Sequence, residues 1–259
     1  MYKIGLKLWS TNTDYYLHEA ERLYAKRVFD YIELFVVPET TGTLNAWQRL
    51  HVERGIPFII HNAHSAVGFN LADTACAKRN REIYRQTKMF ADRLDSRFII
   101  FHGGVDGTIE EVARQLKNLS EPRALLENKP YLPLPGSQNR KVCRGATFDE
   151  ISYVLSEVGC GFCLDIGHAV CAANSQGLEP YAYIEKLASL SPVMFHISDV
   201  KDMTSQYDAH PHLGIGRLDI NRLKNTVFHE GAVISVETVK DSKCSLEDFS
   251  TDVLKLRNV

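Results

Sequence analysis

The 259-residue sequence lacks the features of several specialised classes of protein. No apolar run approaches the roughly 18 residues that a membrane-spanning helix needs, and the first seven residues lack the apolar core of a signal peptide. Lys plus Arg (30) nearly balance Asp plus Glu (32), so a polyanion would have to be held by a local patch or by metal ions. We therefore expect a cytoplasmic protein with no membrane partner, and nothing in the sequence indicates its oligomeric state.

Cysteine is present but gives little indication of a role. The six cysteines are spread over a chain large enough to build a core without disulfides, so we expect reduced thiols. Cys160 and Cys163 form a CxxC pair, a spacing that can bind zinc or carry redox chemistry. Because Cys163 lies in the apolar run 161–166, we interpret the pair as core filling.

Short apolar, β-rich runs alternate with segments of helical composition along the whole chain. Eight such units in about 250 residues predict a single (β/α)₈ TIM-barrel domain over residues 1–259. We expect strands at 2–9, 31–37, 58–63, 98–102, 124–128, 161–166, 193–199 and 232–238. We expect helices at 14–27, 75–94, 108–119, 147–158, 180–190 and 246–257, some opened by a capping residue such as Asp14 or Thr147.

Two basic runs could attract an anion. The proline-containing segment 129–146 follows the fifth strand, so it should lie over the C-terminal face of the barrel. Its cations could meet an anionic substrate there or form a solvated loop: Lys129, Arg140, Lys141 and Arg144. The second run is more typical of a hydrated helix face: Lys78, Arg79, Arg81 and Arg85.

Six of the eight predicted strands end in a residue type that binds metal ions. Buried ionisable groups are costly unless they are paired or bound, and the strand ends of a barrel converge on one cavity. Imidazole and carboxylate ligands suit Zn²⁺, Mn²⁺ or Fe²⁺, and nine candidates exceed the needs of one ion, so we expect two or three. The strand-end candidates are His61, His102, Glu127, Asp165, His196 and Glu237, and the loop candidates are His168, Asp208 and His210.

These residues lie in runs that resemble the motif series of the endonuclease IV branch (AP endonuclease family 2) of the xylose-isomerase-like TIM barrels. The runs are HNAH (61–64), FHGG (101–104), LEN (126–128), LDIGHA (164–169), FHISD (195–199), DAHPHLGIG (208–216) and VET (236–238). The resemblance implies one metal held by His61, His102 and Glu127, a second by Glu127, Asp165, His196 and Glu237, and a third by His168, Asp208 and His210.

The implied activity is hydrolysis of a phosphodiester at an abasic site in DNA, a step of DNA repair, with up to three Zn²⁺. In such a site a metal pair lowers the pKa of a water, and the third metal neutralises charge on the leaving and nonbridging oxygens. The catalytic carboxylates would be Glu127, Glu237 and Asp165. Glu127 would bridge two ions, so its loss should cost more than the loss of a terminal ligand such as His61.

Three positions depart from the endonuclease IV pattern, all on elements that contact DNA in that family. The first strand lacks a His and Gly-Gly segment, His64 stands where an aromatic is usual, and Ala209 stands where Arg is usual. A sugar or sugar-phosphate isomerase, epimerase or dehydratase of the same superfamily therefore remains an alternative. It would use a single Mn²⁺, Co²⁺ or Mg²⁺ at Glu127, Asp165, His196 and Glu237.

Within that alternative, Pro133 and Asp202 disfavour a ketose epimerase, whose pattern has an acid and an arginine at these positions. A third alternative is a barrel that binds metal or carbohydrate without turnover.

Overall fold

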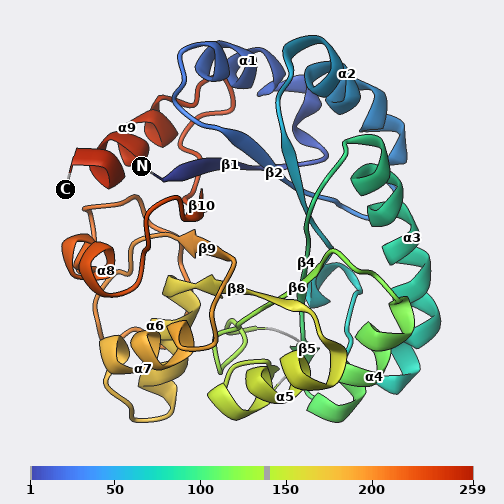
Figure 1. Cartoon of the computed structure of the whole chain (residues 1–259), viewed down its shortest axis with the longest axis vertical. Coiled ribbons are helices and arrows are strands. Elements are labelled where there is room, and N and C mark those ends of the chain that lie inside the picture. The colour runs from blue at the N-terminus through green and yellow to red at the C-terminus, as the bar shows by residue number, and fades with distance from the viewer. Residues whose placement is uncertain (1, 137–140, 259) are drawn as a thin grey trace.

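The computed structural model describes residues 2–136 and 141–258. Parallel strands close into a barrel in the order β1-β10-β9-β8-β6-β4-β3-β2, and helices surround it (Figure 1). The strands are β1 (Lys3–Trp9), β2 (Tyr31–Phe35), β3 (Phe58–His61), β4 (Ile99–His102), β6 (Ala124–Glu127), β8 (Gly161–Asp165), β9 (Met194–Ile197) and β10 (Val233–Val236). Each falls within a predicted run, so the prediction of a (β/α)₈ barrel is confirmed.

The helices follow the strands as a barrel requires. They are α1 (Leu17–Ala25), α2 (Leu44–Arg54), α3 (Ala77–Arg93), α4 (Ile109–Leu119), α5 (Phe148–Val158), α6 (Ile166–Ser175), α7 (Pro180–Ala188), α8 (Ile220–Thr226) and α9 (Glu247–Asn258). Thr147 caps α5 as predicted, since its side chain accepts a hydrogen bond from the Glu150 N–H. Helices α2, α6 and α8 were not among the predicted segments.

The prediction that Asp14 opens the first helix is wrong. Asp14 ends a short 3₁₀ turn (Asn12–Asp14), and α1 begins three residues later at Leu17. The reason is the buried Tyr16, whose hydroxyl donates to the Ser242 carbonyl and anchors the chain just before the helix.

Two residue layers alternate along each strand. One set of side chains faces the helices and forms the main core with buried helix residues such as Trp47, Phe90 and Phe249. The alternate set forms an apolar layer inside the barrel: Tyr31, Ile59, Ile100, Leu125, Cys163, Met194 and Val233. Burial there raises the pKa of Cys163 to about 12, which suits a thiol that fills the core.

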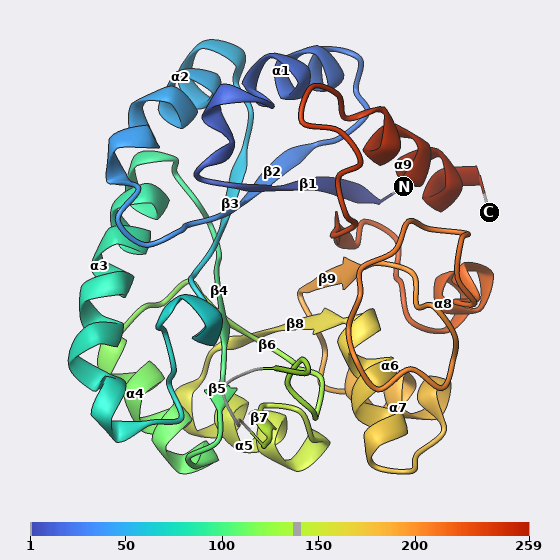
Figure 2. The same cartoon turned by 180° about the vertical axis from the view of Figure 1, so that it is seen from behind.

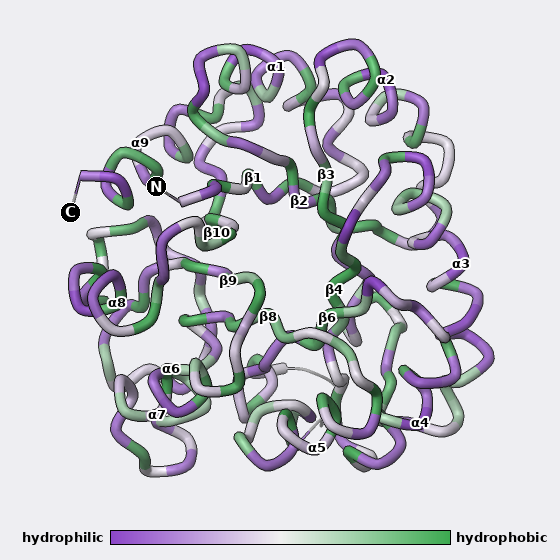
Figure 3. Tube along the Cα trace, in the orientation of Figure 1, coloured by the Kyte–Doolittle hydropathy of each residue, from purple (hydrophilic) through white to green (hydrophobic). Residues whose placement is uncertain are grey.

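The helices are amphipathic, as their position between core and solvent demands. Figure 3 shows hydrophilic and hydrophobic residues alternating along the helices at the rim. Both views place the two termini beside each other at α9 (Figure 2). Among the described residues, no helix is long and apolar enough to span a bilayer.

Segment 129–146 contributes one strand, β7 (Cys143–Arg144), to a short antiparallel ladder with β5 (Gly104–Val105) that the sequence did not indicate. Arg144 is bound into it: its guanidinium donates to the carbonyls of Asp106 and Gly107 and pairs with Glu150 at 2.9 Å. The expectation that Arg144 meets a substrate is therefore not supported, because its donors already have partners. Lys141 is exposed, and Arg140 lies outside the described residues.

The second basic run behaves as expected. Its four cations lie exposed on α3, and Arg79 pairs with Glu39 at 3.2 Å.

Candidate metal centre

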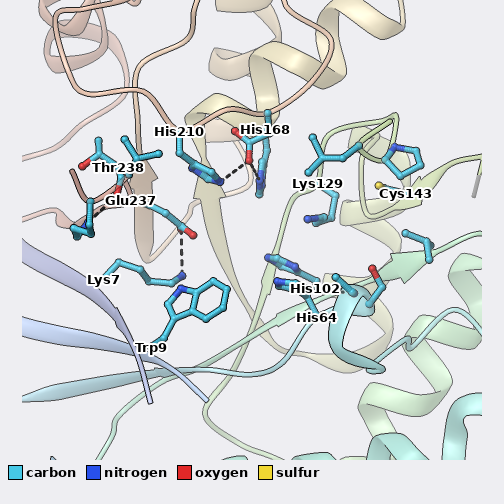
Figure 4. A pocket seen from close by; sticks show the side chains of 18 of the residues that line it. Lys7, Trp9, His64, His102, Lys129, Cys143, His168, His210, Glu237 and Thr238 are labelled. Carbon is cyan, nitrogen blue, oxygen red and sulfur yellow. Dashed lines mark hydrogen bonds and ion pairs between the residues drawn. The ribbon is translucent and has the colours of Figure 1, made fainter. Parts of the chain in front are cut away.

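A cavity of about 730 Å³ opens at the C-terminal ends of the barrel strands. Its lining includes the candidate ligands His102, His168 and Glu237. Pro133 and Leu134 of segment 129–146 form part of its wall. Figure 4 shows these histidines and Glu237 pointing into the same space: His102 from the end of β4, His168 from α6 and Glu237 from just after β10. The cavity is where a barrel enzyme carries its active site.

All nine predicted ligands come together here, in three groups. In each group the ligand atoms lie within 4.8 Å of one another. The groups are His61, His102 and Glu127; Glu127, Asp165, His196 and Glu237; and His168, Asp208 and His210. This is the grouping that the motif series implies.

Glu127, at the end of β6, lies between the groups. Its Oε2 is 2.9 Å from Nε2 of both His61 and His102 and 3.5 Å from Nδ1 of His196. Its Oε1 is 3.2 Å from Nδ1 of His168. A carboxylate in this position can bind ions in two groups at once.

Hydrogen bonds outside the cluster orient three of the imidazoles. Nδ1 of His61 donates to the Asn62 carbonyl at 2.7 Å, and Nδ1 of His168 donates to the Asn128 carbonyl at 2.9 Å. Nε2 of His196 donates to Glu33 Oε2 at 2.8 Å. Each ring thereby directs its other nitrogen toward the cluster, which is the arrangement of metal-binding histidines.

Several buried polar atoms in these groups have no hydrogen-bond partner in the part of the chain that the structure describes. They include both ring nitrogens of His102, Oδ2 of Asp165 and Nδ1 of His196. His102 Nε2 lies close to Glu127 but is not aligned for a hydrogen bond. Unsatisfied buried polar atoms are costly, so several of them converging on one point fit a bound cation.

The pKa shifts of two carboxylates and one histidine favour the protonation states of metal ligands. Burial would raise the pKa of Glu127, but the charges of His102 and His196 hold it well below its ordinary value. Burial would likewise raise the pKa of Glu237, and Lys7 and His196 lower it well below the ordinary value. Burial lowers the pKa of His102 well below its ordinary value.

The third group depends on the loop after β9. Asp208 Oδ2 is 3.2 Å from His168 Nε2 and 2.5 Å from His210 Nε2. Asp199 organises this loop, because its carboxylate accepts hydrogen bonds from four backbone N–H groups, those of Val200, Gly214, Gly216 and Leu218. A side chain at Gly216 would overlap the Val200 carbonyl, so glycine is required there.

Sequence reasoning missed two residues of the site, Lys7 on β1 and Glu33 on β2. Lys7 Nζ lies 2.5 Å from Glu33 Oε1 and 3.2 Å from Glu237 Oε2, and both Lys7 and Glu33 are buried. Burial alone would lower the pKa of Lys7, but Glu237 and Glu33 raise it above its ordinary value. The sequence does contain a sign of both residues, because Lys7 and Glu33 each place a charged side chain within an apolar strand.

Two further histidines, His64 and His212, lie near the predicted ligands in sequence, and the structure separates them. His64 lines the cavity, whereas His212 Nδ1 bonds to the buried Asp252 at 2.7 Å outside the lining. Among the cations of segment 129–146, Lys129 lines the cavity. Burial, followed by the charge of Lys129, lowers the pKa of His64 to about 3.

The sequence matches a family described as xylose isomerase-like TIM barrel over residues 22–257. The chain belongs to this family. The match covers most of the described barrel, including every candidate ligand.

Relatives with similar sequences are named as endonucleases. Proteins named probable endonuclease 4 are 27% identical: one from Thermoplasma volcanium over 141 residues (52% of this chain, about half of that protein), and one from Mycobacterium leprae over 197 residues (73% of this chain, 75% of that protein).

Solved structures of the same fold carry names of two kinds. Endonuclease IV from Thermus thermophilus has a TM-score of 0.64, 20% identity and coverage of 99% of this chain and 98% of that one. A D-tagatose 3-epimerase-like protein has a TM-score of 0.69, 21% identity and coverage of 98% and 96%. At these identities the two structures establish the shared fold alone.

Proposed function

We propose that this xylose isomerase-like barrel is a metal-dependent phosphoester hydrolase with three divalent ions, Zn²⁺ first among them, in an endonuclease IV-like site. Its substrate would be abasic-site DNA or a related phosphate ester, and it would act in the cytoplasm. One observation carries the proposal: there are three complete ligand groups, of which two share Glu127 and the third lies beside it through His168. A single-metal enzyme has no use for the first and third groups.

The charge of the ligand set supports this choice. Glu127, Asp165, Asp208 and Glu237 supply four negative charges, and the adjacent Lys7 and Glu33 cancel each other. Three divalent ions would leave the site positive and attractive to a phosphate, whereas one ion would leave it negative.

The residues of the chain have separate parts in this chemistry. Bound divalent ions would supply Lewis acidity and lower the pKa of a water molecule. Glu127, Asp165 and Glu237 would hold the ions close together, and Lys7 keeps Glu237 ionised and in place. No side chain is needed as a nucleophile.

A sugar or sugar-phosphate isomerase is the second candidate, because the group of Glu127, Asp165, His196 and Glu237 is complete by itself. One Mn²⁺, Co²⁺ or Mg²⁺ bound there could polarise a carbonyl. This candidate leaves the other two groups without a role.

Elemental analysis of protein purified without chelator separates the two candidates. We expect about three ions per chain and cleavage of an abasic-site oligonucleotide or a simple phosphodiester. About one ion per chain, with isomerisation of a sugar and no phosphoester cleavage, would overturn the proposal in favour of the isomerase. Saturation with metal and no turnover on either class would favour a binding protein.

A further inference from the structure

Two polar side chains on the cavity wall lie beside the first ligand group but belong to none of the three groups: His64 and Lys129. Figure 4 shows both pointing into the cavity near His102. They come from different loops, one after β3 and one after β6, so only the tertiary structure brings them together.

The ring of His64 is held in one orientation and one tautomer. It packs against Phe35 with 5.0 Å between ring centroids and stacks on His102 at 6.0 Å. Its Nδ1 accepts a hydrogen bond from the Ala66 N–H at 3.2 Å. The ring proton of the neutral form therefore lies on Nε2, which is a hydrogen-bond donor.

Lys129 is attached to a rigid part of the site. Its own N–H donates to the Gly145 carbonyl at 2.9 Å. The preceding residue, Asn128, exchanges two hydrogen bonds with the backbone of Asp165, at 2.7 and 2.9 Å. The base of the lysine is thus positioned by the same strands that carry the ligands.

The ammonium group of Lys129 has no acceptor and no carboxylate partner among residues 2–136 and 141–258. The other two lysines in the cavity lining differ in this respect: Lys7 pairs with Glu33 and Glu237, and Lys240 donates to the Thr238 carbonyl at 2.7 Å. A cation directed into a partly buried cavity without a partner complements an anionic ligand.

We propose that His64 and Lys129 form a subsite for an oxyanion of the substrate, most directly a phosphate ester. The inference rests on the proposed function only for the choice of phosphate. A cavity of about 730 Å³ has the size of a site for a small molecule, so the ligand is a small phosphate ester or one phosphate group of a larger substrate.

Binding of inorganic phosphate to the metal-loaded protein, measured by isothermal titration calorimetry, tests the subsite. Loss of a charge-assisted hydrogen bond in Lys129→Met should raise the Kd by about tenfold or more, and His64→Phe, which keeps the ring and loses the donor, by roughly threefold to tenfold. Lys129→Arg should keep most of the affinity. Lys141→Met is the matched control, since it removes a charge from the same segment outside the cavity lining.

Metal content is measured for each variant, so that loss of ions is not mistaken for loss of the subsite. Phosphate affinity equal to wild type in Lys129→Met at equal metal content would overturn the inference. Absence of phosphate binding by the loaded wild-type protein would do so too. Phosphate binding that depends on Lys129, without any phosphoester cleavage, would count against the proposed function and leave the subsite standing.

Discussion

The buried pair of Lys7 and Glu33 contacts two candidate ligands at once. Glu33 accepts hydrogen bonds from His196 and from Ser235, and Lys7 contacts both Glu33 and Glu237. Partners of this kind set the tautomer and direction of a metal-binding imidazole. At the scale of single residues, the second ligand group depends on two side chains that bind no ion themselves.

Glu33→Gln should weaken binding of one ion by about 10–100-fold, because the amide holds His196 and Lys7 less strongly than the carboxylate. Titration of the metal-free protein with Zn²⁺ measures this. Glu185→Gln, on an exposed pair with Arg222, is the control. Unchanged affinity in the Glu33 variant would show that Glu33 has no part in holding the ligand.

Glu237→Gln should abolish turnover while thermal unfolding stays cooperative. The amide is a poorer ligand for a divalent ion, whereas Lys7 retains Glu33 as its partner and the apolar layer of the barrel is untouched. Activity and calorimetric melting check the two halves of the prediction. Glu247→Gln, which removes a carboxylate exposed at 67%, is the control. Full activity of the Glu237 variant would refute the site assignment.

Among the elements, five strands (β3, β4, β6, β8 and β9) deliver an apolar residue to the barrel interior and a candidate ligand two residues later. Ile59 precedes His61 in this way, and Leu125 precedes Glu127. The third group is different, since Asp208 and His210 stand on a loop whose shape depends on Asp199 and Gly216. We therefore expect this group to be the most sensitive to changes in loop packing.

Gly216→Ala should lower the metal content by one ion per chain, because the new Cβ overlaps the Val200 carbonyl and displaces the loop. Elemental analysis measures the loss. Gly42→Ala adds a methyl group into open space and serves as the control. An unchanged metal content in both variants would contradict the dependence of the third group on this loop.

At the scale of the whole molecule, the cluster makes stability depend on pH. The pKa values of Glu127 and Glu237 lie below their ordinary 4.5, so these groups stabilise the fold above that pH and lose this effect as the pH falls. Burial would lower the pKa of His168 and His196, but neighbouring groups, Asp165 for His168 and Cys163 and Glu33 for His196, raise it above 6.5. The stabilisation by protonated His168 and His196 is present below pH 6.5 and is lost as the pH rises through their raised pKa values.

The lowered pKa values of His64 and His102 cost stability as the pH falls below 6.5, so the metal-free protein should melt at its highest temperature near pH 6.5 and at lower temperatures toward pH 5 and toward pH 9. Metal binding requires neutral imidazoles and ionised carboxylates, so the stabilisation by metal should grow over the same range. Melting curves with and without Zn²⁺ from pH 5 to 9 test this. A stabilisation by metal that shrinks with rising pH would contradict it.

The eight strands, most of the helical segments between them and the residue types of the nine candidate ligands can be read from the sequence alone. These are local properties: the apolar runs and the residue type at the end of each run are visible without knowing any partner. Helix α6 has no separate start signal in the sequence, because it begins directly after β8 and Asp165 is both the last residue of the strand and the cap of the helix.

The tertiary structure alone brings the interacting charges together. Glu33 and His196 are 163 residues apart and meet because the barrel closes, and Lys7 reaches Glu237 because β1 pairs with β10. It also decided that Lys129 lines the cavity while Arg144 is bound to Glu150. A lysine and an arginine in one loop look equivalent in sequence, because the partner that each one meets is set by segments far away along the chain.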